Sequence, residues 1–235
     1  MNKLIKFGIA SLTMAVAVST FADEQVEDEG AVGWTPIAFG IASPVQLPWG
    51  HAKWDVFGLD FNALYSGSPK MYGLGIAGLG NYMTDDVKGL EVSGLMNWNR
   101  RNTYGASITL GANICNGTSY GFNAGGFGYS EDFWGVDVEF LGAMRNNVWG
   151  WQIGGLANVV KAQSYGWELA VGVNIADVAY GCQTAGIFNM AQELHGCQIG
   201  LVNFAERCPW GFQIGIVNII MDNTIKVLPI VNGYF

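Results

Sequence analysis

The residue types that most often carry chemistry are scarce in this sequence. Its 235 residues include two histidines, His51 and His195, and four cysteines. The cysteines lack the paired spacing of a zinc site. The sequence contains a tandem repeat, described below, and His195 takes a position that a large aromatic ring holds in most other repeats. No serine stands out as the partner of a Ser–His pair. We therefore expect no bound metal, no cofactor and no enzymatic activity. A hydrolase built on a β-barrel is a remote alternative.

A formal dinucleotide motif occurs at residues 73–80, GLGIAGLG. Such a motif binds a nucleotide when it follows a strand, opens a helix and precedes an acidic residue about 20 positions on. Here the glycines belong to a repeat of strands. We expect no nucleotide site.

Polar side chains recur at fixed places in a tandem repeat. A glycine returns every 14 to 16 residues from Gly58 to Gly211, and we number it position 1. Position 3 is commonly Gln, Asp or Glu, and position 9 is often Asn. The last two full repeats carry Asn at position 8, which predicts a bulge. The candidate site residues are Asp60, Glu91, Asp137, Glu139, Gln152, Glu168, Gln183, Gln198, Gln213, Asn97, Asn113, Asn158, Asn174 and Asn189.

The elements that carry these side chains are predicted to be strands. In GWELAVGVNIA, residues 166–176, apolar side chains alternate with polar or small ones, and glycines lie within the segment. Each repeat offers about ten strand residues and a connection of four or five. Two architectures use such a unit: a β-solenoid, in which each repeat is a coil, and an up-and-down β-barrel, in which each repeat is a strand.

Side-chain size and exposure favour the barrel. A 15-residue coil is too narrow to enclose Trp151 and Trp167 in successive coils. Turned outward, the apolar face would leave a long hydrophobic wall, which soluble proteins avoid. In a membrane barrel the same face meets lipid, and the polar face lines the lumen. The expected fold is all-β, an antiparallel membrane β-barrel of about 12–14 short-turn strands, with a β-solenoid of ~15-residue coils as the alternative.

In that barrel the candidate site residues line an acidic lumen that favours cations. The rings mark the two lipid interfaces. These predicted interface aromatics are Tyr72, Tyr104, Tyr120, Trp134, Trp149, Trp151, Tyr165, Trp167, Tyr180, Trp210 and Phe235. The terminal Phe235 resembles the signal that outer-membrane barrels present to their assembly machinery.

The cysteines discriminate between the two folds. In a solenoid, Cys182 and Cys197 share position 2 on stacked coils, about 5 Å apart, which permits a disulfide. In a barrel they lie at opposite ends of antiparallel strands, and Cys208 lies nearer to Cys182. A disulfide between Cys182 and Cys197 would exclude the barrel.

The chain is expected to be exported. Residues 1–22, MNKLIKFGIASLTMAVAVSTFA, predict a signal peptide. Residues 23–33 predict an acidic flexible leader, and residues 34–235 a single β-repeat domain with repeat units from about 57 to 221. Loss of Lys3 and Lys6 with the signal peptide changes the net charge from −8 to −10. Nucleic acid is therefore not an expected partner.

The repeat region resembles bacterial secreted or outer-membrane surface-repeat proteins built from tandem ~15-residue GhQhxGhhN units. The resemblance rests on GCQIGLVNFA, GFQIGIVNI, WDVFGLDFNALYSGSPKMYGLGI and the ending LPIVN. It implies an envelope location and transfers no activity.

The expected function is a passive pore or structural protein of the bacterial outer membrane. Its expected partners are outer-membrane lipid and the barrel-assembly machinery. The alternative is an exposed β-solenoid for binding or adhesion, at the cell surface or in the periplasm. The sequence specifies no solute or protein partner.

Overall fold

The protein is all-β. A computed structural model describes residues 31–43, 45–49 and 53–234, and none of these residues lies in an α-helix. Accordingly, the described part of the chain contains no helix long and apolar enough to cross a membrane. The predicted signal peptide, most of the predicted leader, His51 and Phe235 lie outside the described residues.

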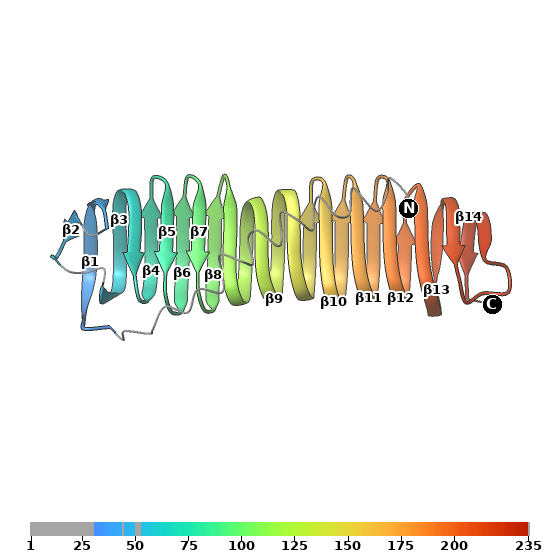
Figure 1. The fold of residues 1–235 in the computed structure, drawn as a ribbon, viewed down its shortest axis with the longest axis horizontal. Coiled ribbons are helices and arrows are strands. Elements are labelled where there is room, and N and C mark those ends of the chain that lie inside the picture. The colour runs from blue at the N-terminus through green and yellow to red at the C-terminus, as the bar shows by residue number, and fades with distance from the viewer. Residues whose placement is uncertain (1–30, 44, 50–52, 235) are drawn as a thin grey trace, which may run out of the picture. The chain divides into compact units, whose positions relative to one another are not determined.

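The strands of the described residues are joined in one sheet system that winds through successive coils (Figure 1). They are β1 (Gly33–Ala42), β2 (Val45–Leu47), β3 (Trp54–Ser68), β4 (Met71–Ala77), β5 (Gly80–Met83), β6 (Val87–Ser93), β7 (Met96–Asn99), β8 (Thr103–Thr109), β9 (Ala112–Gly154), β10 (Ala157–Ala170), β11 (Val173–Ala185), β12 (Phe188–Ile199), β13 (Val202–Ile220) and β14 (Val227–Gly233).

Neighbouring repeats pair in parallel and in register. Gly166 lies opposite Gly181, and Asn174 lies opposite Asn189. Each repeat is therefore one coil of a β-solenoid. The antiparallel barrel that we expected is wrong in this respect, and the alternative fold is the one observed. Cys182 and Cys197 form a disulfide between adjacent coils, with a Cα–Cα distance of 4.6 Å.

Each coil has two flat sides and two edges. Around Gly166, residues 164–170 belong to a wide sheet, and residues 173–176 belong to a narrow sheet. A tight turn at Val171–Gly172 joins the two sheets at one edge. A corner around Asp177 leads into the wide sheet of the next coil. The expected ten-residue strand is therefore two shorter strands that fold back on each other.

Glycine at position 1 permits this close stacking. Gly166 and Gly181 have φ angles of 135° and 133°, which side-chain-bearing residues rarely adopt. A Cβ at Gly181 would overlap the carbonyl oxygen of Gly166. The recurring glycine is thus required by the approach of one coil to the next.

Antiparallel strands cover both ends of the stack. β2 pairs antiparallel with β1 at the N-terminal end, and β14 pairs antiparallel with β13 at the C-terminal end. Terminal strands of this kind protect the open sheet edges from pairing with other chains. The shifted Asn predicted a bulge, but Asn203 lies in register opposite Asn189, and the β12–β13 register is irregular elsewhere, between Glu193 and His195.

Candidate functional site

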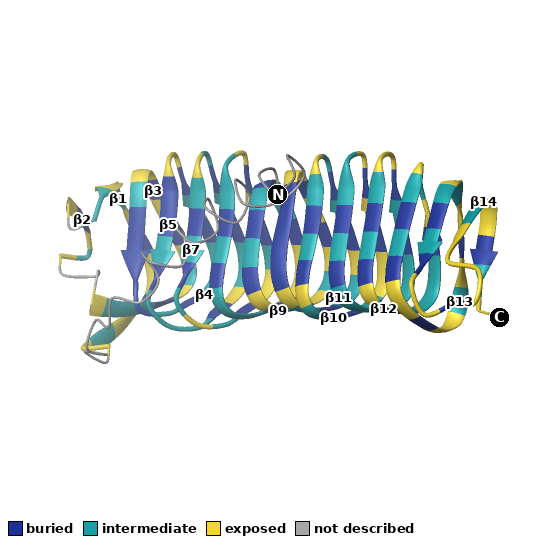
Figure 2. Ribbon diagram, turned by 45° about the vertical axis from the view of Figure 1, so that its right-hand side comes forward, coloured by how far each residue is buried: buried dark blue, intermediate teal, exposed yellow. Residues whose placement is uncertain are grey.

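The predicted lumen residues lie inside the coils, where they are at most 3% exposed. They are Asp60, Glu91, Asp137, Glu139, Gln152, Glu168, Gln183, Gln198, Gln213, Asn97, Asn113, Asn158, Asn174 and Asn189. The sequence correctly placed them on a common face. Because the fold is a solenoid, this face closes on itself and packs side chain against side chain. Figure 2 shows the resulting buried stripes along the strands.

The asparagines form ladders along the stack. Nδ2 of Asn158 donates to Oδ1 of Asn174 at 3.0 Å, and the ladder continues through Asn189 and Asn203 to Asn218 at 2.8–3.0 Å. Asn174 Nδ2 also donates to the Thr184 carbonyl at 2.8 Å. Each such bond ties the turn-side end of one coil to the next. The ladder therefore holds the two sheets together at the turns.

A glutamine ladder runs beside it through the wide sheet. Gln213 donates to Gln198 at 2.7 Å, Gln198 to Gln183 at 2.8 Å, and Gln183 to Glu168 at 3.1 Å. Burial raises the pKa of Glu168 to about 7, against hydrogen bonds from Ser164 and Gln183. Glu168 is thus an acceptor at the end of this ladder.

A buried ion pair interrupts the ladders in the middle of the stack. Arg145 Nη2 lies 2.7 Å from Asp137 Oδ2, and both side chains are fully buried. Burial and the adjacent Asp137 charge raise the pKa of Glu139 to about 8, while Arg145 opposes the shift. Asn113 donates to Glu139 at 3.2 Å. These contacts make the interior a structural network rather than a water-filled passage.

The predicted interface aromatics that precede a repeat glycine lie on the outer surface, in one row rather than two girdles. Because all coils run the same way, the ring before each glycine stacks on its counterpart in the next coil. Centroid distances are 4.3 Å for Trp134–Trp149 and 4.6 Å for Tyr165–Tyr180. The row comprises Phe57, Tyr72, Tyr104, Tyr120, Trp134, Trp149, Tyr165, Tyr180, His195 and Trp210.

Lys88 and His195 complete this aromatic row. The Lys88 ammonium lies 4.8 Å from the Tyr72 ring centroid and 5.6 Å from that of Tyr104, so cation–π contacts bridge the gap between them. His195 stacks on Tyr180 at 4.5 Å, and its Nε2 lies 2.6 Å from Glu193. These contacts give His195 a place in the row, as its position in the repeat predicted.

The rest of the wide sheet's outer surface is apolar as well. Positions 2 and 4 point outward in every coil from Leu59 to Ile214, and Thr184 is the polar side chain among them. We call this surface the wide face. Trp151 and Trp167 lie in its position-2 row, 56% and 46% exposed. Sequence reasoning identified this apolar surface but assigned it to lipid around a barrel.

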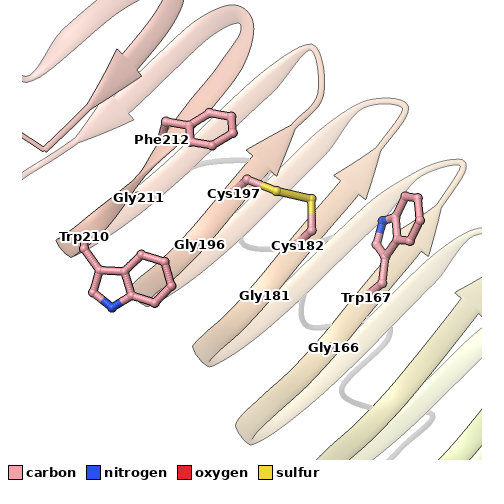
Figure 3. A pocket seen from close by; sticks show the side chains of 9 residues that line it. All are labelled: Gly166, Trp167, Gly181, Cys182, Gly196, Cys197, Trp210, Gly211 and Phe212. Carbon is pink, nitrogen blue, oxygen red and sulfur yellow. A yellow bond between two sulfur atoms is a disulfide. The ribbon is translucent and has the colours of Figure 1, made fainter.

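The wide face contains a shallow groove of about 690 Å³. Cys182 and Cys197 leave a gap in the position-2 row between Trp167 and Phe212, as Figure 3 shows. Trp210 lies across the glycine stripe from them, and the glycines expose backbone between the two rows. The lining is almost wholly apolar, which suits an apolar group better than a polar one.

Comparisons with known proteins find no counterpart. No family model matches the sequence, no curated protein matches it, and no solved structure matches the fold.

Proposed function

We propose that the protein is an exported, surface-exposed β-solenoid that binds partners or mediates adhesion through its wide face, without enzymatic activity. One observation carries this proposal: the outward positions of the wide sheet are apolar from coil to coil. Soluble proteins rarely expose apolar patches larger than a few hundred Å², and larger patches usually mark interaction sites.

Two further features support display outside the cytoplasm. The N-terminal sequence predicts a signal peptide. The Cys182–Cys197 disulfide fits an oxidising compartment, because cytosolic thiols are kept reduced. The envelope location suggested by the resemblance agrees with both.

The test compares bacterial cells that display the protein with cells that do not. Displaying cells should partition more into hexadecane. Combined replacement of Trp151, Trp167 and Phe212 by serine should lower that partitioning severalfold, because it removes large exposed side chains from the wide face.

The matched control replaces Lys161, Gln163 and Gln192 by serine at the corner edge, where all three side chains are exposed. It should partition like the wild type. Equal partitioning of displaying and non-displaying cells would refute adhesion through the wide face. Antibody labelling of intact cells would establish equal display of each variant.

A further inference from the structure

The tight turns between the two sheets form a second apolar feature, at an edge of the stack. We define the aliphatic ridge as Leu156, Val171, Ile187, Leu201 and Ile216, which occupy this turn in five successive coils. Their side chains are 48–73% exposed. The turns lie side by side along the upper edge in Figure 1. We propose that the aliphatic ridge seats the solenoid edge-on in a lipid bilayer surface.

The side chains around the ridge permit shallow insertion. Leu169 precedes Val171 on the wide sheet, and Val173 follows it on the narrow sheet, so the ridge is flanked by apolar residues. Five coils at ~4.8 Å spacing give a ridge of roughly 20 Å. Leu79, Leu95 and Leu110 continue the same edge in the N-terminal half. Surface-bound elements bury such apolar groups about 5–10 Å deep at the acyl boundary.

Much of the backbone of the ridge is already hydrogen-bonded. The carbonyl oxygens of Leu156, Ile187 and Leu201 accept bonds of 2.9–3.0 Å from amides of the following coil. The amides of Val171 and Ile187 donate to the preceding coil at 3.1 Å each. Unpaired backbone groups would oppose transfer into hydrocarbon, because no water is present there to bond them. The coil-to-coil bonds lower that obstacle.

Charge is segregated to the opposite edge of the same coils. The corner residues there are Lys161, Asp177, Glu193, Glu206 and Arg207. Arg207 Nη2 lies 2.8 Å from Glu193 Oε2, so part of this edge is an ion-paired surface suited to water. All five ridge side chains are uncharged. With the ridge in the acyl region, the corner edge lies on the far side of the coil, away from hydrocarbon.

A bilayer fits this edge better than a second protein chain. The ridge is a convex row of branched aliphatic side chains, and a protein partner would need a complementary groove of matching period. Fluid lipid tails fill around such a row without a preformed shape. The inference goes beyond adhesion through the wide face, because it concerns a different edge and leaves the wide face open.

The experiment mixes the purified exported protein with phosphatidylcholine vesicles and floats the vesicles through a density gradient. Wild-type protein should float with them. Val171→Asp combined with Ile187→Asp should reduce the floated fraction at least tenfold. Val171→Ser combined with Ile187→Ser, which adds no charge, should also reduce it. Circular dichroism and thermal melting verify that each variant is folded.

The matched control, Asn146→Asp combined with Gln163→Glu, adds the same charge at exposed positions of the corner edge. It should float like the wild type. Failure of the wild type to float, or equal loss in the ridge and corner variants, would overturn the ridge proposal. Retained hexadecane partitioning in that case leaves the wide-face proposal standing, so the two failures are distinguishable.

Discussion

At the scale of single residues, the interior is built from amide side chains that would be costly to bury unpaired. A buried polar group without a partner costs about 1–3 kcal/mol. Asn174 avoids this cost by donating to both Asn189 and the Thr184 carbonyl. Repetition supplies the partner, because the next coil brings the same residue to the same place. Thus the fixed Gln and Asn positions follow from stacking.

The buried glutamates make stability depend on pH. Glu168 has a folded pKa of about 7, above its ordinary value of 4.5. Folding favours the protonated form of this side chain. Its contribution to stability is therefore full below about pH 4.5 and is lost as pH rises through about 7. Glu91, whose pKa burial also raises to about 7, acts in the same direction.

We expect Glu168→Gln to raise stability at pH 8, on the order of a few kcal/mol, and to change it little at pH 5. The neutral amide keeps an acceptor for Gln183 without a buried charge. Urea unfolding at both pH values measures this. The exposed Glu131→Gln is the control. If Glu168→Gln showed the same difference in unfolding free energy between pH 5 and pH 8 as the wild type, the raised pKa of Glu168 would be contradicted.

At the scale of elements, glycine and the turn define the coil. The positive φ of each position-1 glycine lets adjacent wide strands approach. At the ridge edge, the missing Cβ of turn glycines such as Gly172 and Gly186 allows a similarly close approach. A Cβ at Gly172 would overlap the Leu156 carbonyl oxygen, and one at Gly186 would overlap that of Val171. Glycine at these places therefore permits the close approach of neighbouring coils.

Gly181→Ala should destabilise the protein by more than about 3 kcal/mol, through both its φ of 133° and the clash with Gly166. Gly67→Ala is the matched control, because a methyl there would meet its nearest atom at an ordinary 3.4 Å. Urea unfolding compares the two. Similar losses in both variants would show that close stacking is not the cause.

At the scale of the whole molecule, the described residues form a nearly one-dimensional stack in which each coil contacts its neighbours. Stability in such folds is approximately a sum over coils and their interfaces. The polar ladders and the aromatic row run along the stack, so each added coil extends all of them together. Because each coil repeats the apolar residues of the coil before it, the stack presents them as two continuous surfaces, the wide face and the aliphatic ridge.

Deletion of residues 166–180 removes one 15-residue coil and should leave a folded protein of lower stability. Tyr165 would then precede Gly181, which preserves the repeat. Deletion of residues 166–173 removes half a coil and should abolish cooperative unfolding, because every later ladder loses its register. Circular dichroism and urea unfolding report both results. Equal tolerance of the two deletions would contradict the in-register stack.

The sequence by itself determined the all-β class, the repeat length and the residues that share each face. Period-two alternation places Glu168 and Trp167 on opposite sides of any strand, whatever that strand pairs with. The spacing of Cys182 and Cys197 also made the right test available, because their disulfide is possible between parallel coils. Lys88 stands at the ring position of its repeat in the sequence, but only the folded chain shows that it bridges Tyr72 and Tyr104.

Only the tertiary structure decided how the strands pair and which surface faces outward. Alternation is the same for a strand in a barrel and for one in a coil, so it does not encode the direction of the neighbour. Trp151 and Trp167 lie outside the coil, as their size predicted. The apolar outer wall that disfavoured a solenoid is nevertheless present in this one. The turn at Val171–Gly172 continued the apolar pattern, which concealed that each repeat folds back on itself and presents the ridge.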